Sequence, residues 1–211
     1  FSLLSPEISL DYRDYQARVT YDLDSKNRIG LFAFGAYDYL SETTNDIETV
    51  LFGAEFYRVD ARYDHRLSGG GNLRVASTLG FDQTRVADGR NTHNVLVAQR
   101  MELNKPVGND AVVRAGLDVQ HDVYSADERR FADPDDPDTE EFNSLFPPRT
   151  DGAIATWVDA VWRPAPRLEV TPGLRLDAFA SNGAWALSVD PRLAVVVDVA
   201  PGVRLLHALG M

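Results

Sequence analysis

The sequence predicts an all-β fold of about ten antiparallel, up-and-down strands of a transmembrane β-barrel, forming part of a larger barrel. Three observations predict this fold. Apolar and polar residues alternate with a period of two in one segment after another. These segments are about 9 to 14 residues long, whereas soluble strands cluster near 5 to 6 and membrane-spanning strands need about 9 to 11. Short and longer connections alternate between the segments, as they do in outer-membrane barrels.

The composition excludes several classes of protein. The 211 residues are 44% hydrophobic and 25% charged, and charges interrupt every apolar run before it reaches the roughly 18 to 20 residues of a spanning helix. A helical membrane protein is therefore excluded. A barrel is not, because only alternate residues of its strands face lipid. The net charge of −11 argues against nucleic acid as a partner, and the absence of cysteine excludes a disulfide framework.

Alternation or a long run between turn-forming residues marks each strand in the first half of the chain. Segments 15–23 and 57–66 alternate strictly, and the second has an arginine or aspartate at five consecutive polar positions. Less regular segments lie at 28–40, 73–84 and 94–103. Between them, tight turns are expected at 25–27, 69–71 and 106–109, and longer polar loops at 41–48 and 86–90.

The second half repeats the pattern. Segments 113–120, 167–177 and 187–198 alternate strictly, and less regular strands are expected at 154–162 and 203–209. Tight turns are predicted at 165–166 and 201–202, and longer loops at 125–150 and 181–184. If the strands cross a membrane, the short turns face the periplasm and the longer loops face the exterior.

Charged residues on the polar side of the strands are expected to line an aqueous lumen, where opposite charges are paired or solvated. The candidates are Arg58, Asp60, Arg62, Asp64, Arg66, Arg74, Asp82, Arg114, Asp118, Arg175, Asp177, Asp190 and Arg192.

Aromatic residues gather towards the strand ends near the longer loops, which is typical of the aromatic girdles of barrels and equally of aromatic core residues in a sandwich. They are Tyr37, Tyr39, Phe52, Phe56, Phe81, Tyr124, Trp157, Phe179 and Trp185.

The segment 125–150 is the longest predicted loop. It holds eight acidic residues against three arginines but lacks the ligand spacing of an EF-hand. Its apolar residues Phe142, Leu145 and Phe146 are expected to fold over the barrel mouth and contact a ligand. The four histidines are scattered over separate strands without the pair spacing of common metal sites. No metal or cofactor is therefore expected.

Two stretches resemble the barrel region of TonB-dependent outer-membrane receptors. The first is DYQARVTYDL at 14–23, followed by a turn and RIGLFAFGAYDY at 28–39. The second is DPRL at 190–193, followed by PGVRLLHALG at 201–210. Both are similar to pairs of neighbouring strands in those receptors, and neither contains a catalytic or ligand-binding motif.

The resemblance implies a barrel of about 22 strands with a plug domain. Because neither a plug nor an energy-coupling box is present in this sequence, residues 1–211 are expected to form a single barrel segment that is truncated at both ends. The resemblance also implies a location in the bacterial outer membrane, contact with outer-membrane lipid, and an energy-coupling periplasmic partner. It further implies transport of a scarce nutrient, either a small molecule or a metal chelate.

Two alternatives remain open at the level of sequence. The first is a complete ten-strand outer-membrane hydrolase of protease type, in which His121 and Asp122, with Asp82 and Asp118 on neighbouring strands, activate a water molecule. The second is a soluble β-sandwich that acts as a binding module, because its polar face would also carry alternating charges. The transport barrel is the leading hypothesis, and it needs no catalytic residue.

Overall fold

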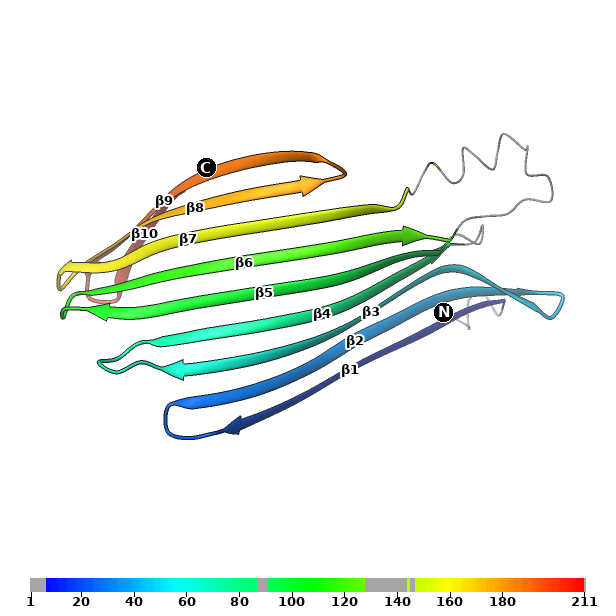
Figure 1. The fold of residues 1–211 in the computed structure, drawn as a ribbon, viewed down its shortest axis with the longest axis horizontal. Coiled ribbons are helices and arrows are strands. Elements are labelled where there is room, and N and C mark those ends of the chain that lie inside the picture. The colour runs from blue at the N-terminus through cyan, green and yellow to red at the C-terminus, as the bar shows by residue number, and fades with distance from the viewer. Residues whose placement is uncertain (1–6, 87–90, 128–143, 145–146, 211) are drawn as a thin grey trace.

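In the computed structural model, ten strands form one antiparallel sheet in which each strand pairs with its neighbours in sequence (Figure 1). The structure describes residues 7–86, 91–127, 144 and 147–210. The strands are β1 (Ile8–Asp22), β2 (Asn27–Thr44), β3 (Ile47–Arg66), β4 (Asn72–Val86), β5 (Asn91–Val107), β6 (Ala111–Ala126), β7 (Arg149–Ala165), β8 (Leu168–Ser181), β9 (Ala184–Ala200) and β10 (Val203–Gly210). This order confirms the predicted all-β, up-and-down architecture. The described part of the chain contains no helical segment with the length and hydropathy of a membrane span.

Eight of the ten strands are longer than the predicted length of about 9 to 14 residues, and the longest, β3, has 20. The other two are β8, with 14 residues, and β10, with 8. A tilted strand crosses the hydrocarbon region with about 9 to 11 residues. Strands with more residues than this continue beyond the segment that would cross the hydrocarbon region, and their polar ends remain paired with the neighbouring strands.

Two of the predicted loops are wrong. Segments 41–48 and 181–184 are hairpins in which only two residues separate the paired strands: Asn45-Asp46 and Asn182-Gly183. All four residues have positive φ, between 45° and 84°. This is the conformation of type I′ hairpin turns, which favour Asn, Asp and Gly. In these two segments, polar residues therefore belong largely to the strands themselves, and a polar composition does not mark the end of a strand.

The other two predicted loops are largely outside the described residues. β4 reaches Val86 and β5 begins at Asn91, so residues 87–90 are not described. β6 reaches Ala126 and β7 begins at Arg149, and most of the intervening segment is likewise not described. Only this last connection is long compared with the turns at the opposite end. The predicted alternation of short and long connections is therefore not a general property of this sheet.

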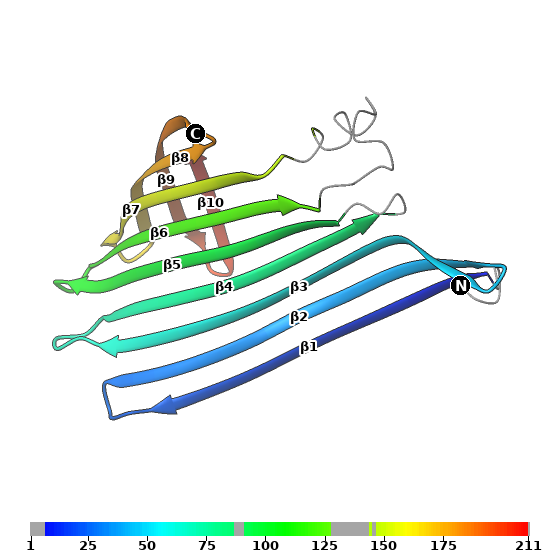
Figure 2. The same cartoon turned by 45° about the vertical axis from the view of Figure 1, so that its right-hand side comes forward.

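The sheet is strongly curved and open. Figure 2 shows β8 to β10 bent away from the broad surface formed by β1 to β6. Among the described strands, β1 pairs only with β2 and β10 pairs only with β9. Each outer edge of the sheet therefore presents a row of backbone N–H and C=O groups without a strand partner.

The sheet has almost no buried core. Among the described residues, the only buried hydrophobic side chains are Tyr39 and Ala155, whereas most of the large apolar side chains of the strands are exposed. A β-sandwich would cover its apolar residues with a second sheet. The described residues form a single sheet, so the sandwich alternative is wrong.

The turn at Gly69–Gly71, between β3 and β4, lies close to the backbone of β5. Gly69 and Gly71 have φ values of 81° and 90°, a conformation that costs an L-residue about 1–2 kcal/mol. A Cβ on Gly71 would also clash with the carbonyl oxygen of Asn104, whereas a Cβ on Gly69 would meet nothing within 4 Å. We expect Gly71→Ala to lower the free energy of unfolding by about 1 kcal/mol more than Gly69→Ala. Urea titration of protein folded in lipid vesicles measures both, and equal losses would contradict the close approach.

Candidate functional site

The register divides the sheet into two chemically different faces. Because successive strand residues point to opposite sides, residues opposite each other in the ladders share a face. One row, which defines the apolar face, runs through Val19, Leu31, Ala61, Ser77, Gln99, Val119, Ile154, Ala178 and Leu187. The adjacent row, which defines the charged face, runs through Arg18, Phe32, Asp60, Thr78, Ala98, Gln120, Ala153, Phe179 and Ala186.

Large exposed side chains cover the apolar face. Val19 is 66% exposed, Leu79 59% and Leu187 68%. A continuous exposed apolar surface of this size requires a covering partner.

All thirteen charged residues that the sequence singled out lie on the charged face. The ladders connect them: Asp64 is opposite Arg74, Arg175 is opposite Asp190, and the others follow by alternation along the same strands. The strand-by-strand pattern thus predicted one common face for residues from β3, β4, β6, β8 and β9.

Ion pairs link neighbouring strands across this face, and in one case they reach to the next strand but one. Arg58 Nη2 lies 2.8 Å from an Asp82 oxygen, and Arg74 Nε lies 2.7 Å from Asp64 Oδ1. Further along, Asp118 accepts from Arg100 Nε at 2.6 Å and from Arg175 Nη1 at 3.4 Å. Pairs of opposite charge therefore follow the curve of the sheet from β3 to β8.

Four of the other candidates form no ion pair among the described residues. Thr78 donates to Asp60 at 3.0 Å, and Ser188 donates to Asp190 at 2.7 Å. Arg66 Nη1 donates to the carbonyl oxygen of Ser25 at 3.4 Å. Arg192 makes no ion pair within the described part of the chain.

Several residues of the charged face were missed at the level of sequence. One of them is Asp159, whose carboxylate accepts two hydrogen bonds from the predicted Arg114, at 2.6 and 2.9 Å. Asn94, itself buried, donates to the buried Asp122 at 2.9 Å and to Asp82 at 3.4 Å. The alternation of Arg100 and Glu102 with apolar residues would have identified these two, but the contacts of Asn94 and Asp159 depend on the register between strands.

The expected aromatic girdle is only partly correct. Tyr37, Tyr39, Phe81 and Trp185 lie on the apolar face, but the register places Phe52, Phe56, Tyr124, Trp157 and Phe179 on the charged face. Closeness to a strand end does not decide the face, because alternation does. On the apolar face an aromatic row does cross the sheet from β1 to β4: ring centroids lie 6.2 Å apart for Tyr15–Tyr57, on either side of β2, and 6.4 Å apart for Tyr57–Phe81.

The His121–Asp122 pair of the hydrolase alternative is wrong as well. The two residues are neighbours in β6 and therefore point to opposite faces, His121 to the apolar face and Asp122 to the charged face. Asp82 and Asp118 are already paired with arginines. The described residues therefore do not assemble the proposed catalytic group.

The three predicted loop contacts, Phe142, Leu145 and Phe146, lie outside the described residues, so their contact with a ligand stays a prediction.

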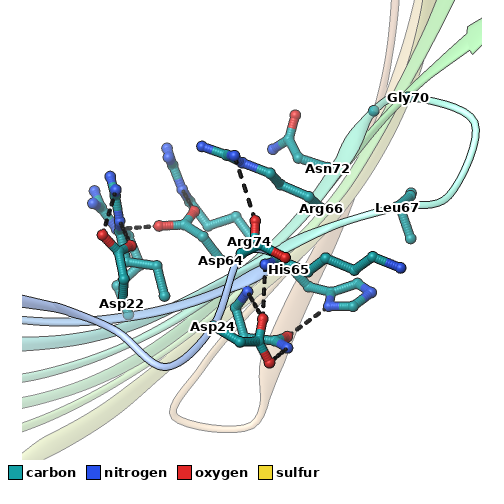
Figure 3. Close-up of a pocket in the computed structure, with 15 residues that line it drawn as sticks. Asp22, Asp24, Asp64, His65, Arg66, Leu67, Gly70, Asn72 and Arg74 are labelled. Atoms are coloured by element: carbon teal, nitrogen blue, oxygen red, sulfur yellow. Dashed lines mark hydrogen bonds and ion pairs between the residues drawn. The ribbon is translucent and has the colours of Figure 1, made fainter.

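A hollow of about 860 Å³ lies at the short-turn end of β1 to β4 (Figure 3). It is lined by Asp22, Asp24, Ser25, Lys26, Asn27, Arg28, Arg62, Asp64, His65, Arg66, Leu67, Gly70, Gly71, Asn72 and Arg74. The carboxylate of Asp24 closes the turn between β1 and β2, since it accepts hydrogen bonds from the backbone N–H groups of Lys26 and Asn27 at 2.7 and 2.8 Å. The side-chain hydrogen bond from Asn27, followed by the one from the Lys26 backbone, lowers the pKa of Asp24.

A second hollow, of about 730 Å³, lies further along the charged face. Its lining reaches from Glu102 in β5 to Ala208 in β10, and it includes Arg114, Trp157 and Arg192. Residues from strands so far apart in the sheet can border one hollow only if the charged face is concave there. The apolar face is then the convex, outer side.

Comparisons with known proteins agree with this geometry. No family model matches the chain, and no curated protein matches its sequence. The fold is similar to the FrpB iron transporter from Neisseria meningitidis, with a TM-score of 0.70, 14% identity, and coverage of 91% of this chain and 34% of that one. It is also similar to the siderophore receptor PirA from Pseudomonas aeruginosa, with a TM-score of 0.67, 14% identity and coverage of 90% and 31%.

A third similar structure is the alcaligin outer-membrane receptor FauA from Bordetella pertussis, with a TM-score of 0.63, 14% identity and coverage of 90% and 33%. The chain thus spans about a third of the length of these solved structures. The barrel-wall fold implied by the resemblance to TonB-dependent receptors is confirmed.

Proposed function

We propose that this chain forms part of the wall of a bacterial outer-membrane transport barrel that takes up a chelated metal, with iron as the metal to test first. The observation that carries the proposal is the separation of faces over ten strands: exposed apolar side chains on the convex side and paired charges on the concave side. The convex side then contacts outer-membrane lipid, and the concave side, with its thirteen candidate residues, lines an aqueous lumen.

The two free edges support a barrel larger than ten strands. In the hydrocarbon region an unpaired backbone N–H or C=O group costs several kcal/mol, and an open sheet edge is therefore not stable in lipid. β1 and β10 are not paired with each other in the described sheet. Additional strands at both edges satisfy these groups, in agreement with the coverage of only about a third of the similar receptors.

The choice of cargo rests on the names of the similar structures, which describe an iron transporter and siderophore receptors. Uptake against a gradient through an outer membrane also needs energy from a periplasmic partner. We therefore include such a partner in the proposal, together with a metal-chelate ligand.

Uptake of radioactive iron by cells of the native host tests the function. The probes are ferric citrate, a ferric trihydroxamate and a ferric tris-catecholate. We expect deletion of the gene to abolish energy-dependent uptake of at least one probe, and a plasmid copy to restore it. A protonophore should abolish the same uptake, because the periplasmic partner draws on the proton gradient. Unchanged uptake of all three probes in the deletion strain would contradict iron chelates as cargo.

A further inference from the structure

The hollow at the short-turn end of β1 to β4 has a surplus of positive charge in a strongly acidic chain. Its lining contains five cationic side chains and three carboxylates, in a protein with a net charge of −11. The cations are Lys26, Arg28, Arg62, Arg66 and Arg74. If this surface served only as a solvated wall, no local excess of cations would be needed.

The carboxylates are already occupied. Asp22 pairs with Arg28 at 2.5 Å, and Asp64 lies between two arginines, 3.0 Å from Arg62 Nε and 2.7 Å from Arg74 Nε. Asp24 is held by the backbone of its own turn. Within the described residues, this leaves Lys26 and Arg66 without an ion-pair partner.

One buried donor in the hollow is only partly satisfied. Arg62 Nε lies 3.0 Å from Asp64 Oδ2, but this ion pair lacks the geometry of a hydrogen bond. A further acceptor beside Arg62 would complete the hydrogen bonding of this donor, which is incomplete among the described residues.

Donor groups from two strands border the hollow. Figure 3 shows Arg66 and Asn72, which are opposite each other in the β3–β4 ladder, on the same side of the sheet. Arg74 and Asp64 lie on the same side, one row further into the sheet. Guanidinium and amide donors from two strands thus border one space.

We propose that this hollow binds a phosphate group. The lining has two cations more than carboxylates, and a phosphomonoester carries a charge of about −1.5 to −2 at pH 7. Three acceptor oxygens match several guanidinium donors, which bind phosphate in fork-like pairs. The phosphate belongs either to a small soluble molecule in the lumen or to a lipid headgroup at the rim. The inference is independent of the transported cargo.

The test uses the protein purified from outer membranes in a non-ionic detergent, with inorganic phosphate as the soluble probe in equilibrium dialysis. We expect saturable binding that Arg66→Gln and Lys26→Gln each weaken about tenfold, since each removes one charge-assisted contact. Arg163→Gln is the matched control: it removes a charge at the same end of the sheet, but from an exposed pair with Glu169 at 2.7 Å. This variant should bind phosphate as the wild type does.

The second arm distinguishes the source of the phosphate. In nanodiscs that contain phosphatidic acid, whose headgroup is a phosphomonoester, phosphorus NMR should show immobilised lipid that Arg66→Gln releases if the ligand is a lipid headgroup. Binding of free phosphate alone is expected if the ligand is soluble. Heat-modifiable gel migration confirms that each variant is folded. Absence of saturable binding in both arms, or equal losses in Arg163→Gln and Arg66→Gln, would overturn the proposal.

Discussion

Leu79→Arg is expected to destabilise the protein in a lipid bilayer by about 2–4 kcal/mol, because an arginine at the midplane of a barrel's lipid-facing surface costs about this much. Leu79 lies near the middle of β4 on the apolar face and is 59% exposed. In water, an exposed leucine could be replaced by arginine at almost no cost. A loss of this size in the free energy of unfolding would therefore indicate that the side chain at position 79 faces lipid.

The adjacent residue provides the control. Thr78 is on the charged face, where its hydroxyl donates to Asp60 at 3.0 Å. An arginine at position 78 can pair with the same carboxylate, so Thr78→Arg should change the free energy of unfolding by less than about 1 kcal/mol. Urea titration in phosphatidylcholine vesicles, followed by tryptophan fluorescence, measures both variants. Similar losses at positions 78 and 79 would contradict the assignment of the faces.

The sequence predicted the charged face well because one physical rule decides it. A strand alternates its side chains regardless of its neighbours, so the row from Arg58 to Asp64 could be assigned to one face from spacing alone. The same rule corrects two expectations: Trp157 is expected in a girdle because aromatic residues gather towards the strand ends near the longer loops, and His121 is combined with Asp122 because they are adjacent in sequence. In both cases, the odd or even position of the residue along its strand identifies the face on which its side chain lies.

Other features could not be predicted, because they depend on contacts between strands. The hollow at the short-turn end of β1 to β4 combines Asp22 with Arg74, which are far apart in the chain and meet only through the registers of β1 to β4. The loop at 41–48 was predicted from its polar composition, yet Glu42 and Thr43 continue the β2–β3 ladder. The polar composition of a segment indicates that it is exposed to water, whereas hydrogen bonding to a neighbouring strand decides whether it is a strand or a loop.

Gly116 and Trp157 are expected to be strongly coupled across the β6–β7 ladder, where they are opposite each other on the charged face. A Cβ on Gly116 would clash with the indole Cε2 and Nε1 atoms of Trp157. The ring thus covers the glycine and borders the second hollow. Gly116→Val should displace the ring and lower the free energy of unfolding by about 3 kcal/mol. Gly152→Val in β7, where an added Cβ meets nothing within 4 Å, is the control and should cost much less.

A double-mutant cycle separates this coupling from a general intolerance of side chains at position 116. Trp157→Ala removes apolar burial and should cost about 2 kcal/mol. Once the indole is absent, the side chain that Gly116→Val adds has space on the concave face. The double variant should therefore be more stable than the sum of the two losses predicts, by at least about 1 kcal/mol. Additive losses would mean that the ring does not rest on Gly116. In that case Trp157 would be free to turn towards the lumen, and the hollow between β5 and β10 would be smaller than the structure shows.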